Sequence, residues 1–188
     1  MSSVIVSYES GTMFIGENLE VISPQDEENI IEVLSNDGES GTSLTIIGGA
    51  LDDSIDLGVA GGSTALGLDG DDMIMGGMGA DLLDGGEGND TLKGGMGADL
   101  LKGGAGNDIF EFLTSDFKAD EIDQIFDFQT GDGEDIVDTI KIMGVSDSVS
   151  YDSDTGLLSV DGEEAIQIGK GLDVDVNQIE GTDNWEVF

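Results

Sequence analysis

Five aspartates recur every nine residues in the middle of this 188-residue chain: Asp72, Asp81, Asp90, Asp99 and Asp108. The last four of them lie between Gly76 and Glu111, in four ungapped copies of the pattern G-G-x-G-x-D-x-U-x, in which U is a large apolar residue. Carboxylates beside glycine carbonyls offer only oxygen donors, which hard divalent cations prefer. The spacing therefore predicts a row of cation sites.

Each nonapeptide predicts a turn followed by a short strand. Glycine permits the tight turn, and the x-U-x triplet has the alternation of a strand with U pointing inward. Such a strand buries its apolar residue only when successive copies stack. Two copies then form one coil of about eighteen residues, so that alternate aspartates become neighbours on two opposite edges. The expected inward residues are Ile74, Leu83, Leu92, Leu101 and Phe110.

Stacking brings the aspartates of alternate repeats close together, where their charges repel unless a cation lies between them. We expect Asp72, Asp90 and Asp108 on one edge, and Asp81 and Asp99 on the other. Calcium accepts carboxylate and carbonyl oxygens in flexible geometry, whereas magnesium demands a tight octahedron and retains water. The pattern therefore favours several Ca²⁺ ions.

This repeat resembles that of the RTX (repeats-in-toxin) family, whose members fold as a right-handed parallel β-roll. The resemblance implies an all-β solenoid in which each turn supplies half a calcium site and the turn two repeats later completes it. It also implies that the aspartate supplies a carboxylate and that glycine carbonyls complete the ligand set. The glycines concerned are Gly77, Gly79, Gly86, Gly88, Gly95, Gly97, Gly104 and Gly106.

Weaker copies of the repeat precede the regular ones. The copy at 67–75 keeps Asp72, the copy at 58–66 has Ser63 in place of the aspartate, and the copy at 48–56 keeps Asp53. We expect Asp53 to be a further candidate ligand and Ser63 to make a poorer half-site facing Asp81. The strand-like segments within residues 29–47 indicate wider coils of the solenoid that bind no metal. We expect capping strands before them.

The segment after the repeats, residues 120–135, resembles the D-x-I-x-D-F-x-x-G-x-D stretch of serralysin-type proteases and mannuronan-epimerase R-modules. That resemblance implies that the segment helps to close the roll and that Asp116, Asp123 and Asp127 bind a further ion. The alternative is a solvated acidic loop. The strand patterns after this segment predict an antiparallel cap. We therefore expect three parts in the chain: an N-terminal cap (1–42), the roll (43–111) and a C-terminal cap (112–188).

Composition excludes several functional classes. The formal net charge of −37 opposes binding to nucleic acid and to anionic membranes. The chain contains neither Cys nor His, which excludes disulfides, Cys/His zinc sites and histidine catalysis. No apolar run reaches the ~20 residues of a membrane span, and no cleavable signal peptide is visible. We find no catalytic motif and expect no enzymatic activity.

The predicted function is that of a non-enzymatic calcium-binding module, secreted or at the cell surface, that folds on meeting calcium after export. RTX proteins leave the cell through a type I secretion apparatus that reads a C-terminal signal, and Glu186-Val187-Phe188 resembles a shortened one. A terminal strand packed into the cap is the alternative interpretation of these residues.

A different hypothesis is an adhesin or carbohydrate-binding module that binds a polysaccharide or a surface protein. It depends on Leu82 and Leu100, which the strand pattern places on the outer face of neighbouring coils. Coverage of both leucines by the C-terminal segment is the alternative.

Overall fold

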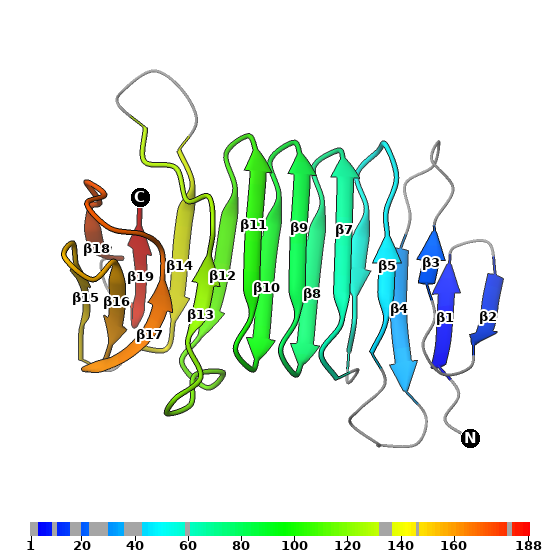
Figure 1. Ribbon diagram of the computed structural model, residues 1–188, viewed down its shortest axis with the longest axis horizontal. Coiled ribbons are helices and arrows are strands. Elements are labelled where there is room, and N and C mark those ends of the chain that lie inside the picture. The colour runs from blue at the N-terminus through cyan, green and yellow to red at the C-terminus, as the bar shows by residue number, and fades with distance from the viewer. Residues whose placement is uncertain are drawn as a thin grey trace.

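The computed structural model describes residues 43–58, 61–131, 137–145, 147–179 and 182–188, together with the backbone of four strands before residue 43. Residues 23–29 and 36–42, between the early strands, lie outside the described residues. The strands stack along one long axis, with the regular repeats in the middle and the two termini towards opposite ends (Figure 1). The described segments contain no helix long and apolar enough to cross a membrane.

Ten strands form one sheet, here called sheet A, with the spatial order β18-β19-β14-β12-β10-β8-β6-β4-β1-β2. Its inner strands are parallel, whereas pairs at both ends are antiparallel. Their bounds are β1 Val4–Tyr8, β2 Gly11–Ile15, β4 Ile30–Ser35, β6 Ser54–Asp56, β8 Met73–Met78, β10 Thr91–Met96, β12 Ile109–Leu113, β14 Thr139–Met143, β18 Val176–Gln178 and β19 Asn184–Val187.

Nine strands form the facing sheet, sheet B, in the order β15-β16-β17-β13-β11-β9-β7-β5-β3. The chain alternates between the two sheets along the repeats, as the eighteen-residue coil predicts. Their bounds are β3 Glu20–Ile22, β5 Thr45–Ile47, β7 Thr64–Asp69, β9 Leu82–Glu87, β11 Leu100–Ala105, β13 Asp123–Ile125, β15 Val149–Asp152, β16 Leu157–Val160 and β17 Glu163–Gln167.

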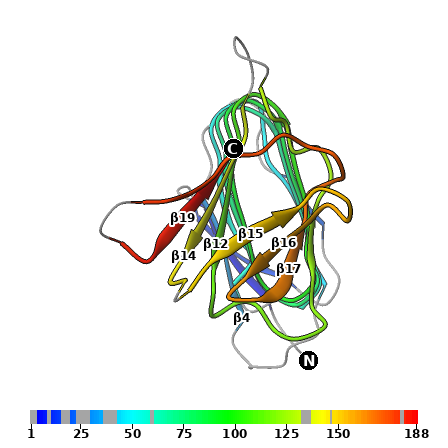
Figure 2. The same cartoon turned by 90° about the vertical axis from the view of Figure 1, so that its left-hand side faces the viewer.

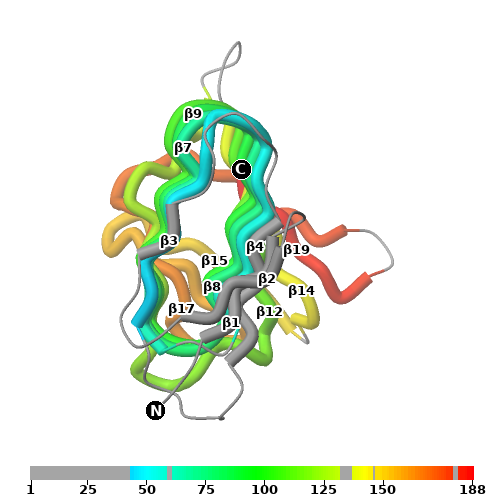
Figure 3. Tube along the Cα trace, turned by 90° about the vertical axis from the view of Figure 1, so that its right-hand side faces the viewer, coloured from blue at the N-terminus to red at the C-terminus, as the bar shows by residue number. Residues whose placement is uncertain are grey.

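The register repeats every eighteen residues where the nonapeptides are regular. Leu92 pairs with Ile74, and Leu101 pairs with Leu83. Viewed along the stack, these coils overlie one another (Figure 3). The predicted all-β, parallel solenoid of two facing sheets is therefore confirmed. Parallel stacking also runs past Glu111, where the nonapeptides end, because β11 pairs with β13 and β12 pairs with β14.

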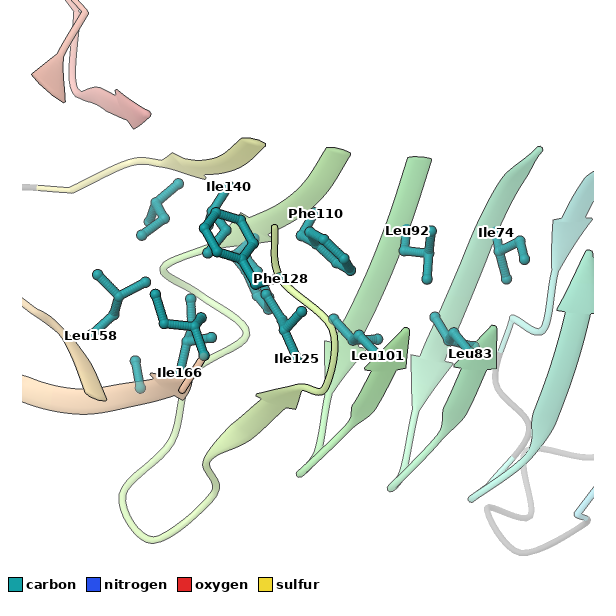
Figure 4. Close-up of a cluster of buried hydrophobic side chains, with 14 of the residues drawn as sticks. Ile74, Leu83, Leu92, Leu101, Phe110, Ile125, Phe128, Ile140, Leu158 and Ile166 are labelled. Carbon is teal, nitrogen blue, oxygen red and sulfur yellow. The ribbon is translucent and has the colours of Figure 1, made fainter. Parts of the chain in front are cut away.

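One column of apolar side chains fills the space between the sheets. The five residues predicted to point inward are all fully buried, and they alternate between sheet A and sheet B along the column (Figure 4). Burying each side chain of this size contributes roughly 1.5–3 kcal/mol. At the C-terminal end the column widens, because Phe110 meets Phe128 with their ring centroids 6.3 Å apart.

The C-terminal cap is antiparallel from β15 onward, whereas β13 and β14, which lie within the range predicted for the cap, continue the parallel stacking of the roll, and β17 pairs in parallel with β13. A hairpin of β15 and β16 continues to β17 in sheet B, while β18 and β19 extend sheet A beyond β14. In the view along the stack, β15, β16 and β17 lie across the end of the roll (Figure 2). Val187 in β19 is fully buried, so the last strand contributes to the core.

Candidate metal centre

Two rows of buried aspartates run along the edges of the solenoid, each aspartate directly before a strand or, for Asp123, at its first residue. We call them the A row, which precedes strands of sheet A, and the B row, which precedes strands of sheet B. Every carboxylate in them is almost completely buried. The A row contains Asp53, Asp72, Asp90, Asp108 and Asp138, and the B row contains Asp81, Asp99 and Asp123, with Ser63 at its start.

From Asp72 onward, one carboxylate oxygen of each row aspartate links it to the coil before. Its Oδ1 accepts a hydrogen bond from the backbone N–H of the residue one coil earlier in the same row. The N–H groups of Asp72, Asp81, Asp90 and Asp99 thus donate to Asp90, Asp99, Asp108 and Asp123 at 2.8, 2.8, 2.9 and 2.9 Å. This bond orients each side chain and ties neighbouring turns together.

The second oxygen of the same carboxylates has no partner. The Oδ2 atoms of Asp72, Asp81, Asp90, Asp99 and Asp108 are buried and accept no hydrogen bond. A buried carboxylate oxygen without a partner is costly, since its lost hydration is not replaced. The geometry therefore leaves one strong acceptor free in each regular turn.

The first glycine of each repeat marks the space that this free oxygen faces. A Cβ on Gly76 would lie 2.7 Å from Asp81 Oδ2 and 2.5 Å from the carbonyl oxygen of Gly94, one coil further on. A Cβ on Gly85 would likewise meet Asp90 Oδ2, and would lie 2.7 Å from the carbonyl oxygen of Gly103. Carboxylate and carbonyl oxygens of successive turns thus converge on one small space, which suits the oxygen coordination of calcium.

The glycines predicted as carbonyl ligands all have left-handed backbones, with φ between 95° and 133°. Carbonyl oxygens of the second and fourth positions point at the same glycine of the next coil: Gly77 faces Gly95, and Gly79 faces Gly97. They lie between stacked turns, where the resemblance places ligands. Gly104 differs, because its carbonyl accepts a hydrogen bond from Gln129 Nε2 at 3.0 Å.

Burial raises the pKa of these carboxyl groups. Desolvation is the largest cause, the charges of neighbouring aspartates add to it, and the backbone hydrogen bond opposes it. The pKa rises from 3.8 to about 7 for Asp72, Asp81, Asp90 and Asp123, and to about 6 for Asp99 and Asp138; that of Asp108 is also raised. Ionised aspartates in these rows therefore need a cation nearby.

Of the less regular candidates, Asp123 occupies a B-row position, since β13 pairs in register with β11. Asp127 lies at the A-row edge, where its carboxylate accepts the N–H groups of Gly103 and Gly104 at 3.0 and 2.9 Å. Asp116 is half-buried, and its charge helps to raise the pKa of Asp99 and Asp123. These three acids thus lie at two different edges.

The two upstream candidates also occupy row positions. Asp53 is buried, and its Oδ2 accepts the N–H of Gly49 at 2.5 Å. Ser63 faces Asp81, whose Oδ1 accepts the Ser63 N–H at 2.6 Å. The Ser63 hydroxyl oxygen in turn accepts the N–H of Leu44 at 3.0 Å, so serine keeps the link between coils without supplying a carboxylate.

Sequence reasoning missed Asp138 and the first-position glycines. Asp138 lies thirty residues after Asp108, whose N–H it accepts at 3.1 Å, and its Oδ2 accepts the N–H of Gln129 at 2.8 Å. The detectable signal was the triplet Asp138-Thr-Ile140, which has the D-x-U phase of the repeats.

Among the described residues, no group of three or more acidic side chains is placed to hold a metal ion.

Comparison with known families supports the repeat assignment. A family model for the RTX calcium-binding nonapeptide repeat matches residues 57–92 and 75–110. No curated protein matches the chain. The match covers both the turns with free carboxylate oxygens and the regular strands of the two sheets. Residues 57–110 of this chain are therefore RTX calcium-binding nonapeptide repeats.

Proposed function

We propose that this chain is a non-enzymatic calcium-binding module whose roll folds when calcium binds, after the chain has been secreted. The observation that carries the proposal is the buried, unpartnered Oδ2 atom in each regular turn. At Asp72, Asp81 and Asp90, that oxygen lies beside the first glycine of its repeat, where an added Cβ would also meet a carbonyl oxygen of the next coil. The ligands would be the row aspartates and the carbonyls of the repeat glycines.

Calcium and folding are coupled in this proposal because each site draws on two turns that meet only in the folded roll. An ion that binds the folded chain and not the unfolded one stabilises the fold by about 2.7 kcal/mol per site at one hundred times its dissociation constant. Several such sites together contribute as much as the whole net stability typical of a domain, about 5–15 kcal/mol. The apolar column alone then need not hold the roll together.

Without calcium, the same rows oppose folding at neutral pH. The carboxyl groups of one row lie on successive coils, about 4.8 Å apart by the spacing of stacked strands. The whole chain also carries a net charge of −37, which adds general repulsion. A calcium-poor cytoplasm would therefore keep the chain largely unfolded, and millimolar calcium outside would fold it.

Export through a type I secretion apparatus would use this unfolded state. The terminal residues Glu186, Val187 and Phe188 resemble a secretion signal, and in the folded chain β19 pairs with β14 and β18. A signal read before folding and a strand used after folding do not conflict, because they operate in different states of the chain. Deleting 184–188 should then abolish export and also weaken the cap.

The test is circular dichroism of the whole chain during calcium titration, with magnesium as the comparison ion. We expect a disordered spectrum in chelator and a strand spectrum in calcium, with magnesium much less effective. Calorimetric titration gives the number of ions. An unchanged strand spectrum in chelator at about pH 8 would refute coupled folding, since the row carboxyl groups are then ionised.

A second candidate function is binding to a polysaccharide or a surface protein through the outer face of sheet B. Leu82 in β9 is 39% exposed, Leu100 in the neighbouring β11 is half-buried, and Phe126, directly after β13, is 62% exposed. The C-terminal segment therefore does not fully cover Leu82. Exposed apolar residues on one face of a sheet are a common feature of interaction surfaces. Glycan or protein binding that survives Leu82→Asp would argue against this face.

A further inference from the structure

A groove lies outside the repeats, where the roll meets the C-terminal cap. Its volume is about 490 Å³, within the range of small-ligand pockets. One wall is the loop at 114–122 between β12 and β13, and the other is formed by residues 160–165, which comprise the end of β16, the turn at 161–162 and the start of β17. The two walls are far apart in sequence, and sheet B brings them together because β13 pairs with β17.

The groove has apolar side chains in its lining. Val160 and Ala165 are buried core residues, and Phe117 and Ile122 are half-buried. Phe117 is held in place because its ring stacks on Phe112, with centroids 5.8 Å apart. An aliphatic chain laid in the groove would therefore meet rigid apolar surface.

The rim of the groove is acidic. Asp120, Asp161, Glu163 and Glu164 line it and are all exposed, whereas Lys118 is the one basic side chain in the lining. Lys118 already has an acidic neighbour outside the lining, Glu121, at 3.6 Å. The rim thus presents an excess of negative charge, which the strongly acidic chain as a whole reinforces.

The hairpin side of the rim is fixed by hydrogen bonds. Asp161 Oδ1 accepts the backbone N–H groups of Asp147 and Ser148 at 2.7 and 3.1 Å. This contact ties the β16–β17 turn to the residues before β15. Because this wall is already ordered, a ligand would lose less conformational entropy of the protein on binding.

We propose that this groove binds a basic peptide segment in which lysine or arginine alternates with apolar residues. The stems of lysine and arginine lie well on apolar surface while their charged heads reach outward, which matches an apolar lining below an acidic rim. A second copy of this chain is a poor occupant, because it carries five lysines against forty-two acidic residues. Phosphate-bearing polymers and anionic lipids would be repelled.

The test is fluorescence anisotropy of a short labelled peptide of alternating lysine and leucine, at physiological salt. The whole chain is used in saturating calcium, and circular dichroism verifies the fold of each variant. The test variant is Glu163→Gln with Glu164→Gln, and we expect it to weaken binding about fivefold, since two exposed charge contacts are lost. The proposal concerns the cap and does not depend on calcium-driven folding.

The matched control is Asp173→Asn with Asp175→Asn, which removes the same charge from exposed positions outside the groove. Unchanged affinity in this control, together with weaker binding of an alternating lysine–glycine peptide, supports the proposal. Equal loss in both double variants would show non-specific attraction to an acidic protein and overturn it. Equal binding of the two peptides, or no binding to the unmodified chain, would also overturn it.

Discussion

Replacing Asp90 with asparagine should stabilise the calcium-free roll and destabilise the calcium-bound one. Asp90 is 1% exposed, and its Oδ1 accepts the Asp72 N–H at 2.8 Å while its Oδ2 has no partner. Asparagine keeps the accepting oxygen and removes the charge. The substitution therefore isolates the electrostatic role of one row position while preserving the bond between coils.

The magnitude without calcium follows from the raised pKa. Burial takes the pKa of Asp90 from 3.8 to about 7, a difference of about 3 pH units. At about 1.4 kcal/mol per unit, ionising the folded carboxyl group costs up to about 4 kcal/mol, which we halve to about 2 kcal/mol because solvent at the edge screens the charge. Asparagine avoids this cost.

The sign of the pH dependence is fixed by the direction of the shift. A raised pKa means that the folded state holds its proton more tightly, so the contribution to stability is full below 3.8 and is lost as pH rises through about 7. The advantage of Asp90→Asn in chelator should therefore be absent near pH 4 and complete near pH 8. In saturating calcium the same change removes a charged ligand, and we expect at least tenfold weaker binding, about 1.4 kcal/mol.

The assay is urea unfolding followed by circular dichroism, in chelator at about pH 5 and about pH 8 and in calcium at about pH 8. If the roll does not fold in chelator, two other measurements replace the urea comparison. The calcium concentration at half-folding reports the effect of the substitution on the calcium-bound roll. Folding in chelator with an added osmolyte reports its effect on the calcium-free roll. Asp69→Asn is the control, since it removes an exposed charge from the neighbouring coil. Destabilisation by Asp90→Asn in chelator at about pH 8 would refute the reasoning.

Two further substitutions separate the metal sites from the core. Gly85→Ala should weaken calcium binding about tenfold or more, because its Cβ would meet Asp90 Oδ2 and lie 2.7 Å from the Gly103 carbonyl oxygen; unchanged affinity in calorimetric titration would contradict this. Leu92→Ala should lower the free energy of unfolding by about 2–5 kcal/mol in calcium, because Leu92 is fully buried, while leaving the number of bound ions unchanged. A loss below about 1 kcal/mol would mean that the column is loosely packed.

Regular repeats made much of this structure predictable. The nine-residue period places an apolar residue inward and an aspartate at a turn in every copy, as with Leu92 and Asp90. One register therefore explains both the core and the edge rows. Ser63 was predicted to face Asp81, and the hydrogen bond between them confirms that position. These inferences needed only the period, because each coil repeats the environment of the coil before it.

The irregular end was harder to interpret from the sequence. Asp123 and Asp138 follow Asp99 and Asp108 by twenty-four and thirty residues, so the eighteen-residue step does not reach them. Both nevertheless continue the rows, because strand pairing restores the register after each longer loop. Asp127 looked like a member of the same set, yet it binds backbone N–H groups at Gly103 and Gly104.

The sequence by itself determined the solenoid, its apolar column and the chemistry of its turns, because period and residue type repeat together. Only the tertiary structure decided which oxygen is free in the five aspartates from Asp72 to Asp108, since their Oδ1 atoms are taken by N–H groups of another coil. It alone also decided that the loop at 114–122 and the β16–β17 turn enclose a groove. Both outcomes depend on contacts between segments far apart in the chain, which no local pattern encodes.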